Sequence, residues 1–376
     1  MDTAQPLYDF APLARMMLLG VVIALGPLAW VWLRNRQAPA AQRLRVLTLL
    51  TLFLTFDLVL FGAFTRLTDS GLGCPDWPGC YGSASPIGAH ADISAAQEAM
   101  PTGPVTHSTA WVEMIHRYLA TAVGVLILVL ASVSWVERKR LKVSHWWPMV
   151  TLFWVCLQGA FGALTVTMKL FPAIVTLHLM FGIGLLALLM AQAVRYEGAA
   201  SRPIPSALRS GLWWGFGLLW LQIALGGWVS TNYAVLACPD FPTCNGQWVP
   251  DMNWQGFSLW RELGLTPEGQ VLPFVALSTI HFVHRSAAWL VLAVLLWCGW
   301  RLRQQAKLHT AGRLLLGLSA LQFFRGLSNV VFDWPLLAAV LHTGGAAAMV
   351  VTLTWVLSIS RADNALRFSN PSRPAE

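Results

Sequence analysis

The chain has 376 residues, of which 56% are hydrophobic and only 11% are charged. Soluble domains average about 25% charged residues, so this composition excludes a protein whose whole surface faces water. The formal net charge is +8, but the basic residues cluster in short gaps between apolar blocks. Such clustering indicates membrane orientation rather than a nucleic-acid partner.

The apolar blocks predict nine membrane-spanning helices, because each is long enough to cross the roughly 30 Å core of a bilayer. In chain order the predicted helices cover 12–33, 44–64, 109–135, 147–166, 172–194, 210–231, 277–300, 313–331 and 335–359. The loops between them alternate between basic and acidic or mixed composition. By the positive-inside rule, the N-terminus is expected outside the cytoplasm and the C-terminal tail inside.

Two loops predicted on the outer side, 65–108 and 232–276, each contain a pair of cysteines. The pairs are Cys74 with Cys80 and Cys238 with Cys244. Disulfides are permitted outside the cytoplasm, and prolines stiffen each short loop. Two interpretations stay open at this point: a redox-active pair that passes electrons or engages a partner, and a structural disulfide over the mouth of a helix bundle.

The sequence contains an internal repeat. The cysteine loop CPDWPGC returns 164 positions later as CPDFPTC, and His178 returns at the same displacement as His342. His116 returns as His284 with a displacement of 168, which requires only a slightly longer loop in the second copy. The repeated residues also include Gln158 and Gly162, which return as Gln322 and Gly326. The predicted fold is therefore an all-α integral membrane protein with two tandem, pseudo-symmetric four-helix bundles and one extra N-terminal helix.

The repeat divides the chain into four predicted segments. Residues 1–43 contain the extra helix and a basic cytoplasmic loop, and residues 362–376 form a cytoplasmic tail. Between them lie the first half, residues 44–200, and the second half, residues 201–361.

Each half places two histidines roughly 10 Å below the outer end of its second and fourth helices, at 1.5 Å per residue. They are His116 and His178 in the first half and His284 and His342 in the second half. Imidazole within a bilayer is expensive and usually marks a functional site. Two helices that present histidines at one level are suited to holding a haem iron between axial ligands. A zinc site would need further ligands, and only Glu113 and His281 are near.

Arg117 and Arg285 each directly follow one of these histidines. Both are candidate cofactor-binding residues, because arginine suits carboxylate recognition and a haem carries two propionates. The alternative is that each side chain snorkels, with its charged group held in water at the membrane interface. One helical turn before His116 stands Glu113, whereas His281 occupies the corresponding position in the second half. Only the carboxylate can act as an anion there. The first half is therefore predicted to perform chemistry and the second to hold a cofactor.

Several motifs resemble bacterial haem A synthases. The stretch FGAFTRLTDSGLGCPDWP at 61–78 is similar to the first outer loop of that family, and QIALGGWVSTN at 222–232 is similar to the start of its second half. The motifs EMIHR at 113–117 and TLH at 176–178 also match the family, and His284, Asn329 and His342 complete the pattern.

The resemblance implies that a pyrrole methyl group of haem O is oxidised to a formyl group by successive hydroxylations, which gives haem A for terminal oxidases. It implies that His116 and His178 hold the substrate haem O and that Glu113 is the catalytic carboxylate. His284 and His342 would hold a permanent haem b. The implied setting is the bacterial inner membrane and its lipid, with haem O synthase, an electron donor of unknown identity and terminal oxidase assembly factors as partners.

Two other classes of protein fit parts of the sequence. A transmembrane b-type cytochrome would use two haems only as electron relays, and a transporter could be built from parallel repeats. The position of all four histidines toward one face argues against a relay that must cross the bilayer. A transporter gives no reason for paired histidines or matched cysteine loops. Arg325 and Asp57 lie within predicted spans and receive no assigned role.

Overall fold

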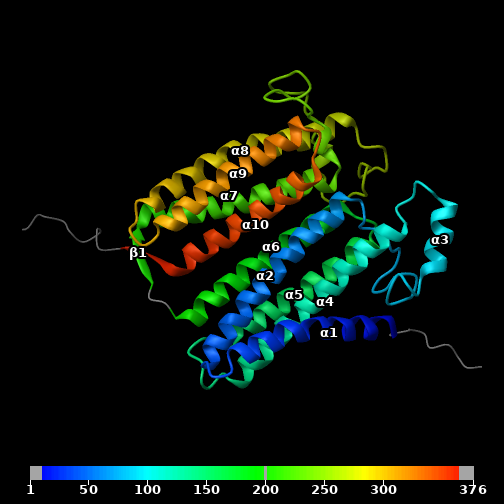
Figure 1. Ribbon diagram of the computed structural model, residues 1–376. Coiled ribbons are helices and arrows are strands. Elements are labelled where there is room, and N and C mark those ends of the chain that lie inside the picture. Colours follow the sequence, from blue (N-terminus) through cyan, green and yellow to red (C-terminus); the bar gives the residue numbers. More distant parts are fainter. Residues whose placement is uncertain (1–10, 199–200, 364–376) are drawn as a thin grey trace, which may run out of the picture.

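The computed structural model describes residues 11–198 and 201–363 (Figure 1). The first ten residues and the predicted tail from residue 364 onward lie outside the described residues. The helices are α1 (Ala11–Arg34), α2 (Ala40–Leu67), α3 (His90–Ala99), α4 (His107–Val136), α5 (Trp146–Thr167), α6 (Pro172–Glu197), α7 (Ser206–Thr231), α8 (Phe274–Arg303), α9 (His309–Val331) and α10 (Leu336–Ile359). Two short 3₁₀ helices, η1 (Ala234–Leu236) and η2 (Trp254–Phe257), lie in the second long loop.

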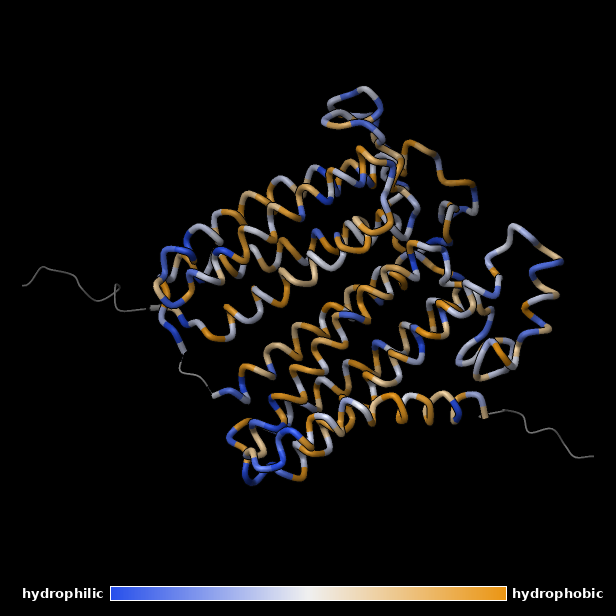
Figure 2. Tube along the Cα trace, in the orientation of Figure 1, coloured by the Kyte–Doolittle hydropathy of each residue, from blue (hydrophilic) through white to orange (hydrophobic). Residues whose placement is uncertain are grey.

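Within the described residues, nine helices are long and apolar enough to cross a membrane, namely all of these α-helices except α3. Helices satisfy their own backbone hydrogen bonds, which is what a hydrocarbon environment demands. Figure 2 shows hydrophobic residues along the helices and hydrophilic residues gathered at their ends. The prediction of an all-α, multi-pass membrane protein with nine spans is confirmed.

The helix boundaries differ from the predicted ones by a few residues. Helix α7 begins at Ser206 rather than 210, and α9 begins at His309 rather than 313, because both helices extend beyond the apolar run into residues that include polar side chains. Two elements were not predicted. Helix α3 lies in the first long loop, and β1 (Arg202–Pro205) pairs in parallel with β2 (Ser360–Asp363). This pairing joins the segment before α7 to the end of α10.

The spanning helices lie in two groups (Figure 1). Helices α7, α8, α9 and α10 form one group, and α2, α4, α5 and α6 form the other, with α1 packed along α4, where Gly20 lies against Thr121. Helix α10 lies next to α2 of the other group, and Gly344 of α10 packs against the Leu60 side chain. The division of the chain into two four-helix halves and the functional division between them stay predictions.

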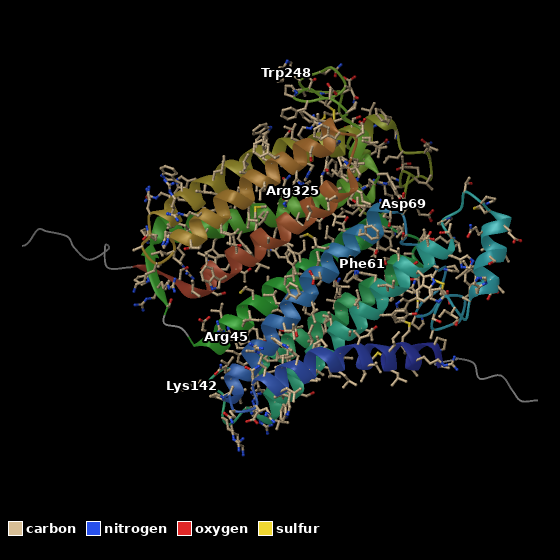
Figure 3. All side chains as sticks on the ribbon, in the orientation of Figure 1. Arg45, Phe61, Asp69, Lys142, Trp248 and Arg325 are labelled. Carbon is tan, nitrogen blue, oxygen red and sulfur yellow. A yellow bond between two sulfur atoms is a disulfide. The ribbon has the colours of Figure 1, made fainter. Side chains whose placement is uncertain are left out.

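The two ends of the helices differ in character. Figure 3 places Arg45 and Lys142 at one end, and Asp69 and Trp248 toward the other end, where the two cysteine loops lie. These are named the basic end and the cysteine end below.

The two groups of helices contact each other at the cysteine end through equivalent positions of the repeat. The Arg66 guanidinium donates to the carbonyl of Ser230 at 2.6 Å, and the Tyr233 hydroxyl donates to the Asp69 carboxylate at 2.8 Å. Arg66 also lies 4.0 Å from the centre of the Tyr233 ring. Each hydrogen-bonded pair joins residues 164 positions apart, which is the displacement of the repeat.

Candidate functional site

The first histidine pair lies on α4 and α6. His116 of α4 packs against Gly62 of α2, where an added Cβ would come within 3.0 Å of the His116 Nε2 atom. His178 of α6 packs against Gly162 of α5, with the corresponding distance 3.2 Å to Cε1. The two imidazoles are close enough to interact electrostatically. The structure thus brings together the two histidines predicted for the first half.

The second histidine pair repeats this arrangement on α8 and α10. His284 packs against Gly226 of α7, where an added Cβ would lie 2.9 Å from the His284 Cε1 atom. His342 packs against Gly326 of α9, at 3.2 Å by the same measure. These imidazoles also interact electrostatically with each other.

A glycine therefore makes room for each of the four imidazoles, since any Cβ at that position would press on the ring. Gly62 and Gly226 are equivalent positions of the repeat, as are Gly162 and Gly326. Sequence reasoning used Gly162 and Gly326 only as markers of the repeat and missed their role. The available signal was the recurrence of glycine and histidine together at one displacement.

Three glutamines lie beside three of the histidines. The Gln222 amide nitrogen lies 3.0 Å from the His284 Nδ1 atom and donates to the backbone carbonyl of the same residue at 3.0 Å. Gln322 donates to the His342 carbonyl at 2.9 Å, and the Gln158 amide lies 3.5 Å from the His178 ring. His116 instead stacks with Phe61, with 6.3 Å between ring centres (Figure 3 labels Phe61).

Several polar atoms at both sites are buried without a hydrogen-bond partner. They are the Nδ1 atoms of His178 and His342 and the side-chain oxygens of Gln158, Gln222 and Gln322. Native proteins leave few such atoms unpaired, because each one costs free energy. All four imidazoles of the pairs are only half-buried. Half-buried histidines that pack against glycines and lie among unpaired buried polar atoms fit a haem held by two histidines in each half.

Glu113 is buried, with 4% of its surface exposed, and both of its oxygens have partners. Arg117, one turn further along α4, forms an ion pair with Oε1, and the backbone N–H of Cys74 donates to Oε2 at 2.8 Å. The carboxylate thus joins α4 to the first cysteine loop. His281, at the corresponding position of α8, is also buried, and its Nδ1 atom has no partner.

Arg117 and Arg285 hold the backbones of the two cysteine loops. Arg117 donates to the carbonyls of Asp76, Pro78 and Gly79. Arg285 donates to the carbonyls of Asp240 and Thr243 at 2.7 Å each, and to that of Cys238 at 2.8 Å. Sequence reasoning did not foresee these contacts. Propionate binding by either arginine stays a prediction.

The cysteines of each loop lie at disulfide distance. The Cα atoms of Cys74 and Cys80 are 4.9 Å apart, and those of Cys238 and Cys244 are 4.7 Å apart. All four cysteines are buried. Burial favours the structural interpretation, because a sulfur without access to a partner exchanges slowly.

Asp240 organises the second cysteine loop. Its carboxylate accepts the Thr243 hydroxyl and the backbone N–H groups of Asn245 and Gly246. The Thr243 hydroxyl, followed by these N–H groups, lowers the pKa of Asp240 to about 2. Because the pKa is lowered in the folded protein, the ionised Asp240 carboxylate stabilises the folded loop at pH values above the unfolded pKa of 3.8. This stabilisation is lost as the pH falls through about 2.

We expect Asp240→Asn to speed the reduction of the Cys238–Cys244 disulfide by a water-soluble thiol at pH 7 by about fivefold to thirtyfold, because loss of the charge on the hydrogen bonds of the loop costs about 1–2 kcal/mol. The Cys74–Cys80 disulfide, in the same sample, should react at the parent's rate. Peptide mapping after timed alkylation measures both. Equal acceleration of both disulfides, or of neither, would contradict the local role of Asp240.

Arg325 and Asp57 have different surroundings. Arg325 of α9 donates to the carbonyl of Leu341 at 3.0 Å and interacts electrostatically with His342 (labelled in Figure 3). Among the described side chains it has no ion-pair partner. The repeat position in the first half is Phe161, so only the second site has this positive charge. Asp57 is exposed on α2.

The glycine contacts yield a direct test of the histidine sites. Gly226→Ala is expected to displace the His284 ring and to weaken haem retention by about tenfold or more. Mutation of a residue that supports a metal ligand typically lowers metal affinity by about this factor. Gly217→Ala on the same helix is the control, because nothing lies within 4 Å of an added Cβ there. Haem content per protein after detergent purification is the measurement. Equal haem content in the two variants would refute the role of Gly226.

Nine spanning helices, with a pair of histidines in each repeat that pack against glycines, define a class: an integral membrane protein with histidines inside its helix bundle. Comparison with known proteins narrows this class. The family described as cytochrome oxidase assembly protein, COX15-CtaA, matches residues 45–354. The chain belongs to that family.

Curated relatives agree with the family match. A protein named heme A synthase from Shewanella oneidensis is 38% identical over 316 residues, which is 82% of this chain and 93% of the relative. Proteins of the same name from Symbiobacterium thermophilum and Halalkalibacterium halodurans are 28% and 26% identical, covering 81% and 79% of this chain and 90% of each relative.

Proposed function

We propose that this protein is a haem A synthase, a haem-dependent membrane oxidoreductase that converts haem O into haem A. The observation that carries the proposal is the pair of facing histidines on glycine-lined helices in each half, in a chain of the COX15-CtaA family. The relatives named heme A synthase match this chain over most of their own length, which supports the same activity.

The two halves are assigned different tasks. His116 and His178 orient the substrate haem O, and both residues are half-buried. His284 and His342 hold haem b, which supplies a one-electron redox centre when bound. Gln222 holds the backbone at His284 by donating to its carbonyl at 3.0 Å. Arg325 adds a fixed positive charge beside His342 that favours the reduced form of the centre.

Glu113 is assigned the electrostatic part of the reaction. Its carboxylate is fixed by Arg117 and by the Cys74 N–H group, one helical turn from His116. A buried, immobile carboxylate can stabilise positive charge that develops on the substrate carbon during oxidation, without reorganising at that moment. The second half has His281 in this place and lacks such an anion.

The cellular setting is proposed from charge and family. The basic end faces the cytoplasm by the positive-inside rule, with the N-terminus in the periplasm and the C-terminus in the cytoplasm of a bacterial inner membrane. The histidines then lie toward the periplasmic side. Haem O synthase as the source of substrate, an electron donor and terminal oxidase assembly factors are the proposed partners.

The test is to produce the protein together with haem O synthase in a bacterial host that makes no haem A. Extracted haems are then separated by chromatography. Haem A is expected to appear with this chain and to be absent without it. Recovery of haem b alone, while haem O accumulates in the same membranes, would instead favour a b-type electron carrier.

A further inference from the structure

A groove of about 810 Å³ lies between α5 and α6 on one side and α7 and α10 on the other. Its walls include four tryptophans, Trp147, Trp154, Trp213 and Trp220, together with small and aliphatic residues of α6. Trp213, Phe216 and Trp220 follow one another on one face of α7, with 5.9 and 6.0 Å between successive ring centres. None of the histidines of the two haem sites lines this groove.

Two arginines stand at the basic end of the groove. Arg195 of α6 lies 3.7 Å from the centre of the Trp147 ring and donates to the Ala191 carbonyl. Arg209 of α7 donates to the carbonyl and the hydroxyl of Ser360. No acidic side chain lines the groove, and among the described side chains neither arginine has an ion-pair partner. The nearby Glu197 is already paired with Arg45 at 3.0 Å.

A second, smaller pocket of about 420 Å³ adjoins the groove and shares Arg209 and Trp213 with it. Its other lining residues are Ser206, Ser210 and Trp214. Two hydroxyls and a guanidinium are suited to a phosphate group, because all three can donate hydrogen bonds to its oxygens. A polar pocket and an apolar groove thus meet at Arg209.

The dimensions fit one leaflet of a bilayer. Along α6, the groove extends from Met180 to Arg195, which is about 22 Å at 1.5 Å per residue. Half of a bilayer with its headgroup region included is about 20–22 Å. The aromatic wall therefore reaches from the region of the midplane to the basic end, where phospholipid headgroups lie.

We propose that this groove is a binding site for one phospholipid with an anionic headgroup, drawn from the leaflet at the basic end. Its acyl chains lie along the tryptophans between α5–α6 and α7–α10, and its phosphate is held by Arg195, Arg209 and the hydroxyls of Ser206 and Ser210. The site joins the two groups of helices, because α6 and α7 contribute residues from opposite halves. It is separate from the proposed haem chemistry.

The experiment is native mass spectrometry of the full-length protein in detergent, after delipidation and titration with phosphatidylglycerol or phosphatidylcholine of identical acyl chains. One phosphatidylglycerol is expected to bind in preference to phosphatidylcholine. The double variant Arg195→Gln, Arg209→Gln should lose about 30-fold in affinity for phosphatidylglycerol, given the contribution of each basic residue near an anionic surface. Its thermal unfolding without lipid checks that the variant is folded.

Arg138→Gln is the matched control. Arg138 also stacks on a tryptophan, Trp135, at 5.0 Å and donates to its carbonyl, but it does not line the groove. It should bind phosphatidylglycerol as the parent does. Equal binding of the two lipids, unchanged binding in a folded double variant, or displacement by soluble glycerol phosphate would overturn the proposal. The proposal would also be overturned if the delipidated protein formed oligomers in which a second copy of the chain covers the groove.

Discussion

Replacing His284 with alanine is expected to strip the protein of haem b while haem O still binds to the first half. The His284 imidazole is the ligand that α8 is predicted to present at the level of His342, and Gly226 and the contact of Gln222 with the His284 carbonyl hold this residue in place. Loss of a neighbour that merely orients a ligand costs about 10–100-fold in metal affinity, so loss of the ligand itself should exceed that. Chromatography of extracted haems, normalised to protein, measures the effect.

The converse variant sharpens this prediction. His116→Ala should retain haem b and lose bound haem O, because the two pairs lie in different groups of helices (Figure 1). His309→Ala, an exposed histidine at the start of α9, is the control and should keep both haems. If His116→Ala loses haem b and His284→Ala keeps it, the assignment of the two halves is reversed.

Glu113→Gln is expected to lower turnover of haem O by about 100-fold or more, the loss typical when one preorganised electrostatic group is removed from an active site. Glutamine keeps an oxygen that can accept the Cys74 N–H group, and Arg117 keeps its three carbonyl acceptors in the loop. The loop and the bound haems should therefore remain. The measurement is the ratio of haem A to haem O at equal haem content.

The variant Glu113→Ala distinguishes the electrostatic role of the Glu113 side chain from its structural role. Like Glu113→Gln it leaves the buried Arg117 without an anion, and it also removes the acceptor of the Cys74 N–H group. A buried donor left without a partner costs about 1–3 kcal/mol. We expect this variant to unfold at a lower temperature than Glu113→Gln. Glu137→Gln, which breaks the Glu137–Arg140 pair at the other end of α4, should change neither property. Full turnover by a folded Glu113→Gln protein would rule out the electrostatic role.

The spans and histidine pairs could be predicted because they depend on local pattern. Long apolar runs identify helices in any membrane protein, and the displacement shared by His178 and His342 needs no three-dimensional information. The pairing of Glu113 with Arg117 also follows the four-residue spacing of neighbours on a helix face.

Other features depend on which helix faces which, and the sequence alone does not give this. The contact of Gly226 with His284 requires α7 and α8 to pack in one rotational setting. The hydrogen bond from Cys74 to Glu113 requires the first loop to fold back over α4. The pairing of β1 with β2 joins segments far apart in the chain, and short strands have no distinctive pattern of their own.

The contacts of Arg66 with Ser230 and of Asp69 with Tyr233 have a consequence for self-association. Residues that meet their own repeat counterparts lie on an axis of approximate two-fold symmetry. Two identical copies of the first half around that axis would place Arg66 against Arg66 and Asp69 against Asp69, and like charges would repel. These contacts therefore favour association of the first half with the second half over association with an identical copy of itself. Covalent linkage in one chain guarantees that each first histidine pair is assembled beside a second one.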